Sequence, residues 1–242
     1  MKDDAYTDLI LVVPAKADDE REAVIQAWKA GGGKVSRLGR FWEPPCYQTE
    51  TVRLYGNSTF CEILAQKLSL KLVSPVDELL SLIDERWLNR QVAIIELSEI
   101  NGRDFPLFAK SLVPKLFRSA VYPSTQSLEN ECQGLDGATK IVTSSVVEIT
   151  SEVRAFVLHG SVLTASFYEG QGELPEALAF IEELIEEIGH LLPATYVLDV
   201  AQTTSGNWLL LEANAAWGAG LNGCCPKAVA RCLAEATKVD IS

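Results

Sequence analysis

Two short apolar runs near the C-terminal end of the chain, separated by a polar stretch, constrain the fold more than any other feature. The first run ends at Asp199, and thirteen residues later the second ends at Glu212, with Asn214 two positions further on. The polar residues between them, 202–207, are typical of a hairpin turn. We therefore expect an antiparallel hairpin that brings Asp199 and Glu212 together at one end, with Glu212 and Asn214 on one face of their strand.

The chemistry of these three side chains indicates a metal site. Carboxylate and amide oxygens are the ligands that a hard cation such as Mg²⁺ prefers, and Mg²⁺ held by one or two carboxylates usually also binds substrate phosphates. The hairpin therefore points toward nucleotide chemistry. A metal-dependent hydrolase that uses the same carboxylates without a nucleotide is an alternative.

The charge balance excludes two classes of partner. The chain has 242 residues, of which 21 are Lys or Arg and 33 are Asp or Glu, so its formal net charge is -12. Non-specific binding to nucleic acid or to an anionic membrane needs a basic surface. We therefore expect neither as a partner, and the composition leaves the oligomeric state open.

The cysteines and the N-terminal residues predict a cytoplasmic protein. None of the six cysteines forms a Cys-x-x-Cys pair, and the first residues do not resemble a signal peptide. We interpret the cysteines as reduced thiols. A zinc site is not expected, because the two histidines lie far apart without ligand spacing. We interpret His159 as a turn residue and His190 as a helix-end residue rather than as catalytic groups.

The first part of the chain alternates between strand and helix patterns, which predicts a small α/β unit with a parallel sheet. Thr59 and Glu62 have the spacing of a capping box at the start of the second helix. Residues 31–34 are not expected to form a phosphate loop, because they end a helix and precede a strand, the reverse of the required order. The predicted strands are 9–13, 34–38, 52–55 and 70–73, and the predicted helices are 18–30, 59–68 and 75–88.

From about residue 90 the chain becomes rich in short strands. The dipeptide 159–160 is expected to form a hairpin turn between the last two of them. A long amphipathic helix and a shorter final helix are expected on either side of the Asp199 hairpin. The predicted strands are 107–109, 119–122, 141–148, 153–158 and 161–167, and the predicted helices are 174–192 and 227–239.

Several charged side chains could serve a phosphate. Lys110 stands near the end of a predicted strand, with Lys115 five residues later, although each could be an ordinary surface lysine. Glu152 and Arg154 alternate on one strand face. They could form an ion pair without a function, but Arg154 would also suit a phosphate, because a guanidinium binds two oxygens at once.

The segment 217–223 carries three glycines directly after the Glu212 and Asn214 pair. Glycine permits a backbone to approach a ligand closely, so this segment is a candidate ligand loop that includes Gly220. A plain structural turn is the alternative.

With these parts in this order, the sequence resembles the ATP-grasp superfamily. The ending of the chain closely resembles a compact, poorly characterised clade whose expected signature is one lysine and two arginines, with Arg90 as our candidate for the second arginine. The segments that carry the resemblance are 108–115 (the lysine strand), 144–149 (the hinge), 151–157 (the strand with an arginine) and 211–226 (the ending).

The resemblance implies an α/β (α+β) chain with the ATP-grasp fold. A small pre-ATP-grasp α/β unit would cover residues 1–88, and the ATP-grasp domain, with the nucleotide and Mg²⁺ site, would cover residues 89–242. Ser111 follows Lys110 where many members have proline, and the chain is shorter than typical ligases of the superfamily.

The resemblance also implies roles for individual residues. Lys110 and Arg154 would be the catalytic residues that stabilise the phosphates of ATP, and Glu148 and Ile149 would contact ribose and adenine. The implied Mg²⁺ ligands are Asp199, Glu212 and Asn214, and the further nucleotide-site residues are Arg90, Lys115, Glu152 and Gly220.

The implied activity is an ATP-dependent carboxylate–amine (or thiol) ligase that works through an acyl-phosphate. Its partners would be ATP and a small-molecule or peptide carboxylate and amine. A nucleotide-binding regulatory protein without turnover and a small-molecule kinase remain alternatives, because both need the same phosphate and metal groups.

Overall fold

The computed structural model describes residues 5–100, 104–113 and 116–240. The chain forms two compact units: unit 1 comprises residues 1–75, 151–200 and 212–242, and unit 2 comprises residues 76–150 and 201–211. The division into two domains at residue 88 stays a prediction.

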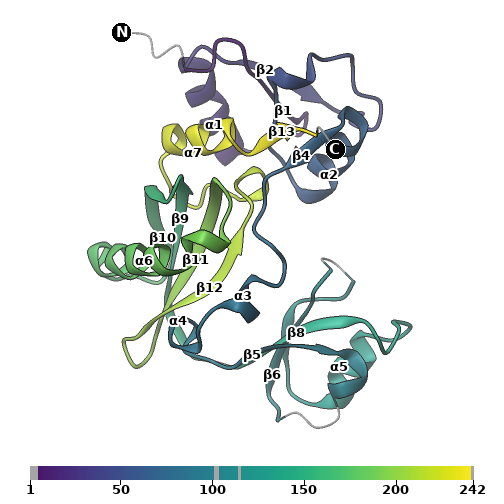
Figure 1. The fold of residues 1–242 in the computed structure, drawn as a ribbon, viewed down its shortest axis with the longest axis vertical. Helices are drawn as coiled ribbons and strands as arrows, with labels where there is room; N and C mark the ends of the chain where they lie inside the picture. The colour runs from purple at the N-terminus through teal and green to yellow at the C-terminus, as the bar shows by residue number, and fades with distance from the viewer. Residues whose placement is uncertain (1–4, 101–103, 114–115, 241–242) are drawn as a thin grey trace. The chain divides into compact units, whose positions relative to one another are not determined.

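A small parallel sheet in unit 1 confirms the predicted α/β pattern at the N-terminal end. Its central strand β1 is apolar, with Leu11, Val12 and Val13 fully buried. The strands lie in the order β2-β1-β3, with residues 49–51 forming a 3-10 turn before β3. The elements are β1 (Ile10–Pro14), α1 (Asp19–Ala30), β2 (Lys34–Leu38), β3 (Val52–Leu54) and α2 (Ser58–Leu68) (Figure 1).

The helices of this part begin at polar caps. Asp18 caps α1 by accepting a hydrogen bond from the backbone N–H of Arg21 at 2.9 Å. The predicted capping box at Thr59 is wrong. Asn57 is the cap of α2, because its Oδ1 accepts from the backbone N–H of Phe60 at 2.9 Å.

A second sheet in the strand order β10-β9-β11-β12 carries the predicted C-terminal hairpin, in which the N–H of Thr203 donates to the carbonyl of Asn207 at 2.9 Å. The predicted turn at His159 and Gly160 is also present, with φ values of 49° and 73°. The elements are β9 (Ile149–Leu158), β10 (Ser161–Glu169), α6 (Leu174–Ile188), a 3-10 turn (Gly189–Leu191), β11 (Thr195–Thr203) and β12 (Trp208–Asn214).

The C-terminal segment differs from the prediction. The last helix, α7 (Pro226–Ala234), packs against α1, and residues 237–239, predicted as helix, form strand β13. β13 pairs antiparallel with β4 (Leu70–Leu72), so β4 does not join the parallel sheet. The C-terminal end of the chain thereby completes the packing of the N-terminal part (Figure 1).

Unit 2 contains an antiparallel sheet in the order β5-β8-β6-β7. The predicted helix 75–88 is wrong, because residues 83–84 are extended or capping and leave only two short helices. β5 and α5 have no counterpart in the prediction. The elements are α3 (Leu79–Leu82), α4 (Glu85–Leu88), β5 (Val92–Glu96), a 3-10 turn (Leu97–Ile100), β6 (Leu107–Ser111), β7 (Ala120–Tyr122), α5 (Thr125–Glu131) and β8 (Lys140–Ser145).

Among the described residues, none of the helices combines the length and the apolar character that a membrane span requires.

Candidate functional site

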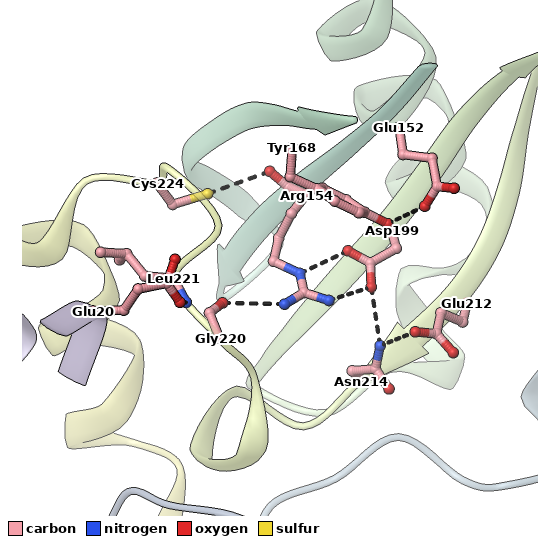
Figure 2. Close-up of polar contacts among 10 residues, drawn as sticks. All are labelled: Glu20, Glu152, Arg154, Tyr168, Asp199, Glu212, Asn214, Gly220, Leu221 and Cys224. Atoms are coloured by element: carbon pink, nitrogen blue, oxygen red, sulfur yellow. Dashed lines mark hydrogen bonds and ion pairs between the residues drawn. The ribbon is translucent and has the colours of Figure 1, made fainter. Parts of the chain in front are cut away.

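The centre of the candidate site in unit 1 is an ion pair between neighbouring strands. The Arg154 guanidinium on β9 donates from Nε to Oδ1 of Asp199 on β11 at 2.8 Å, and from the terminal NH2 nitrogen to Oδ2 at 2.7 Å (Figure 2). Asp199 is completely buried. Two parallel hydrogen bonds fix both the distance and the plane of the guanidinium.

Local strand geometry explains why these two charges face each other. Arg154 lies two positions before Phe156, and Asp199 lies two positions after Val197, so each shares a strand face with a buried apolar residue of the same core. The charged pair therefore occupies the edge of a packed surface rather than open solvent.

Burial acts in opposite directions on the two groups of this pair. It raises the pKa of the Asp199 carboxyl, and the nearby charge of Glu212 adds to the rise, while Arg154 opposes it. Burial lowers the pKa of Arg154, but the hydrogen bonds and charge of Asp199 outweigh burial and leave that pKa raised. Arg154 therefore stays charged.

The other two predicted metal ligands meet this pair. Nδ2 of Asn214 donates to Oδ2 of Asp199 at 3.1 Å and to Oε1 of Glu212 at 2.8 Å (Figure 2). The hairpin thus brings the three side chains together, with the amide nitrogen of Asn214 between the two carboxylates.

The donor set fits Mg²⁺ in its chemistry, since it offers two carboxylates and one amide. In this conformation, however, Arg154 engages both oxygens of Asp199, and Asn214 presents its nitrogen rather than its oxygen. In the described part of the chain, this site included, no three or more His, Cys, Asp or Glu side chains gather as a metal site. Coordination through the Asn214 oxygen therefore requires that amide to turn, and Arg154 competes with a metal for the oxygens of Asp199.

Tyr168 on β10 joins the site without having been predicted. Its hydroxyl donates to the carboxylate of Glu152, and the Arg154 guanidinium lies 5.5 Å from the centre of its ring. The pairing of β10 with β9 is irregular between residues 167 and 169. Such a bulge re-aims a side chain, and no pattern in the sequence marked it.

The predicted glycine loop reaches the site through its backbone. The carbonyl of Gly220 accepts from the NH1 nitrogen of Arg154 at 3.1 Å, and the N–H groups of Leu221 and Asn222 each donate to Glu20 at 2.9 Å. Glu20, on the first turn of α1, was not predicted. Glu20 lies about 200 positions before the loop in sequence, and no motif around it indicates a contact with the loop.

One of the two predicted lysines, Lys110, lies on β6 of unit 2. Lys110 is partly buried and alternates along β6 with buried residues, so it lies on the face opposite the core of this sheet. Lys115 lies outside the described residues.

Arg90 is buried in unit 2 and acts there as a backbone clamp. Its Nε donates to Oγ of Ser144 at 3.1 Å. NH1 donates to the carbonyls of Leu88 and Leu210 at 2.9 and 2.8 Å. NH2 donates to the carbonyl of Leu211 at 3.0 Å. Burial lowers the pKa of Arg90 to about 10. Its expected role toward a phosphate stays a prediction.

Of the predicted hinge at 144–149, Glu148 immediately precedes β9 and Ile149 begins it. The backbone carbonyl of Glu148 accepts from the N–H of Thr204 at 3.1 Å, and Ile149 is 36% exposed. An exposed apolar side chain at the end of a strand is compatible with contact to a base, which stays a prediction.

The family follows from a comparison with protein-family models. The model described as "ATP-grasp domain, R2K clade family 2" matches residues 87–232. The chain belongs to this ATP-grasp family. The match begins in α4 and ends in α7, so it includes Arg90, Lys110 and Arg154.

Solved structures agree with this ATP-grasp fold. The RimK domain protein ATP-grasp from Sphaerobacter thermophilus DSM 20745 has 16% identity and a TM-score of 0.61, covering 93% of this chain and 99% of that one. The L-amino acid ligase from Bacillus licheniformis has 13% identity and a TM-score of 0.57, covering 85% and 66%.

A third similar structure is the ATP-grasp ligase PsnB complexed with a phosphomimetic variant of a minimal precursor, Mg and ADP. It has 12% identity and a TM-score of 0.52, covering 88% of this chain and 90% of that one. A search of curated protein sequences gives no significant match. At these identities the likeness shows the fold of this ATP-grasp chain and not its substrate.

Proposed function

We propose that this ATP-grasp chain binds ATP with Mg²⁺ and joins a carboxylate to an amine or a thiol through an acyl-phosphate. The observation that carries the proposal is the hydrogen-bonded set of Arg154, Asp199, Asn214 and Glu212. A nucleoside triphosphate with its metal requires a guanidinium that can bind two phosphate oxygens, next to hard oxygen ligands for the metal.

The reaction proposed has two balanced steps. An oxygen of the substrate carboxylate attacks the γ-phosphorus of ATP, the bond to the β-phosphate oxygen breaks, and ADP leaves. The amine nitrogen (or thiol sulfur) then attacks the acyl carbon, inorganic phosphate leaves, and the nucleophile loses a proton. Such chemistry depends on positioning and charge neutralisation rather than on a protein nucleophile.

Within this scheme the residues of unit 1 have separate tasks. Arg154 would exchange part of its pairing with Asp199 for phosphate oxygens, since both acceptors suit its planar fork. Glu152 is held by Tyr168, which limits it to shaping the site around the guanidinium. When bound, Mg²⁺ would supply charge neutralisation for the phosphates; its proposed ligands are Asp199, Glu212 and Asn214.

For residues 76–150 we propose the roles in nucleotide binding that the sequence resemblance implies. Lys110, together with Lys115, would supply point charges for the phosphates, and Arg90 is the candidate for the second arginine. Glu148 and Ile149 would contact ribose and adenine.

Similar structures support a choice of substrate class for testing. The L-amino acid ligase and the PsnB complex with a precursor variant suggest amino acids and peptides as the first carboxylates and amines to examine. We therefore propose that class ahead of other metabolites.

Acyl-phosphate trapping tests the proposal directly. The protein is incubated with ATP, Mg²⁺ and a panel of amino acids and peptides, with and without hydroxylamine. A ligase releases ADP and forms hydroxamate with the correct carboxylate. A phosphorylated product stable to hydroxylamine would indicate a kinase. Absence of ATP binding by calorimetry at millimolar ATP and Mg²⁺ would overturn the proposal as a whole.

A further inference from the structure

We propose that Glu20 is a positioning residue that acts on Arg154 through the glycine-rich loop. The inference rests on the proposed function, because it concerns the nucleotide affinity that Arg154 would provide. It adds a residue of the N-terminal α/β part, outside the segment 87–232 that the family model matches.

The first step in the argument is the contact between Glu20 and the loop. Its Oε2 accepts from the N–H of Leu221 and its Oε1 from the N–H of Asn222, each at 2.9 Å. Figure 2 shows Glu20 beside Leu221. The bonds join residues 201 and 202 positions apart in sequence. One carboxylate thus fixes two consecutive peptide groups.

The loop backbone is shaped to receive such a carboxylate. Asn222 and Gly223 have φ values of 47° and 78°, the left-handed region. A turn of this kind directs successive N–H groups toward one point and forms a concavity for an anion. A Cβ at Gly223 would lie 2.7 Å from Oγ of Ser166, so the chain needs glycine at that position to hold the turn.

The second step is the contact between the loop and Arg154. Gly220 immediately precedes the two N–H groups that Glu20 holds, and its carbonyl accepts from NH1 of Arg154 at 3.1 Å. The Nε and NH2 nitrogens of Arg154 are occupied by Asp199. The Gly220 carbonyl therefore supports the remaining arm of the guanidinium.

The limited space around Gly220 shows how closely Gly220, Glu20 and Arg154 pack together. An added Cβ would lie 3.2 Å from Oε2 of Glu20 and 3.7 Å from NH1 of Arg154. Movement of the loop would alter both contacts at once. At its other end the loop is tied by a bond from the N–H of Gly56 to the carbonyl of Trp217 at 3.1 Å.

The other acidic residues of this helix turn do not share the arrangement. Asp18 caps α1, and Glu22 pairs with Arg37 at 2.6 Å. Asp19, exposed like Glu20, stands in the same first turn, where any acidic residue interacts favourably with the helix dipole. Glu20 is the acid of this turn that holds the loop, so Asp19→Asn is a matched control for a general charge effect.

The test is a cycle of ATP affinities measured by calorimetry with Mg²⁺ present. The variants are Glu20→Ala, Glu20→Gln, Asp19→Asn, Arg154→Met and the double variant Glu20→Ala/Arg154→Met. We expect Glu20→Ala to weaken ATP binding about tenfold, on the scale of a lost charge-assisted contact. Glu20→Gln should restore part of the loss, because its carbonyl oxygen still accepts one N–H. Asp19→Asn should bind ATP like the unchanged protein.

The double variant tests whether Glu20 affects ATP affinity by positioning Arg154 or independently of Arg154. If Glu20 acts through Arg154, removing Glu20 from the Arg154→Met protein should cost nothing further. If the losses of ATP-binding free energy in the two single variants add in the double variant, the inference is overturned. It is also overturned if Glu20→Ala binds ATP as tightly as the unchanged protein does.

Hydrogen exchange supplies a readout that needs no ligand. The amides of Leu221 and Asn222 should exchange faster in Glu20→Ala than in the unchanged protein or in Asp19→Asn. Equal exchange would also overturn the inference. A protein that binds no ATP before any substitution would overturn the proposed function and this inference together, whereas ATP binding lost only in Arg154→Met would overturn this inference alone.

Discussion

Arg154 and Asp199 face each other across strands β9 and β11 in a two-point ion pair, with hydrogen bonds of 2.8 and 2.7 Å. The pair uses both oxygens of the buried carboxylate that is also a proposed metal ligand. An arginine and a divalent cation therefore compete for one group. The arrangement predicts that the metal enters most readily when nucleotide phosphates offer Arg154 another partner.

Arg154→Met should strengthen the binding of a divalent cation in the absence of nucleotide. The substitution keeps an apolar stem but leaves the Asp199 carboxylate without its resident cation. We expect about tenfold tighter binding of Mn²⁺, equivalent to roughly 1.4 kcal/mol. Calorimetry or paramagnetic resonance with Mn²⁺ measures it, with Arg231→Met, at an exposed position of α7, as the control. Weaker Mn²⁺ binding by Arg154→Met would show that the arginine does not block the metal.

Glu212→Gln should leave the fold intact and reduce ATP turnover. The substituted amide can still accept the hydrogen bond that Asn214 donates at 2.8 Å, but it loses the charge that a metal requires. The expected loss is on the order of 10²-fold, as for removal of one preorganised electrostatic group. Rates of ADP release and melting temperatures are compared with those of Glu169→Gln, an exposed carboxylate on β10. Near-normal turnover would remove Glu212 from the metal site.

Gly220→Val should reduce ATP affinity more than it reduces stability. Its side chain would press on Glu20 and Arg154, because even a Cβ would lie 3.2 Å from the Glu20 carboxylate. Gly39→Val is a suitable control, since the nearest atom to an added Cβ there is 3.9 Å away. Melting temperature and ATP affinity are measured on both variants. An early-melting Gly220→Val that keeps full affinity at low temperature would indicate that the loop is only scaffold.

Two cysteines should react readily with a thiol reagent in the native protein. All six are free in the structure, but only Cys46 and Cys225 are exposed. Burial raises the pKa of Cys224 and of Cys232 to about 11, so at pH 8 both remain protonated and unreactive. Titration with a chromogenic disulfide should count two fast thiols in the native state and six after unfolding. More than two fast thiols would contradict the described packing.

Tyr196→Phe should not weaken the fold. The Tyr196 hydroxyl is buried without a hydrogen-bond partner, and burial raises the pKa of this group to about 12. Removing an unsatisfied polar group should leave the free energy of unfolding unchanged or raise it by up to about 1 kcal/mol. Tyr122→Phe is the contrasting control, because the Tyr122 hydroxyl donates to the carbonyl of Arg118 at 2.5 Å. Denaturant unfolding measures both, and a clear loss in Tyr196→Phe would reveal a hidden partner.

Local patterns account for the elements that the sequence predicted well. The alternation and length of apolar runs identified the three strands of the parallel sheet and the hairpin at 199–212, because period-2 and period-3.6 patterns need only neighbouring residues. The helix expected at 75–88 failed for the same reason. The apolar spacing of 75–88 suits a helix, but Ile83 is extended. Asp84 then caps a separate short helix, α4, by accepting a hydrogen bond from the backbone N–H of Arg86.

The sequence by itself determined that Asp199, Glu212 and Asn214 would meet, since a short hairpin allows few registers. Tertiary structure alone decided that Arg154 would hold Asp199, that Glu20 would hold the loop, and that Arg90 would clamp the backbone of β12. These partners lie 45 to 202 positions apart. Their contacts depend on strand order, on a bulge and on how separate segments pack, and no local pattern in the chain records those choices.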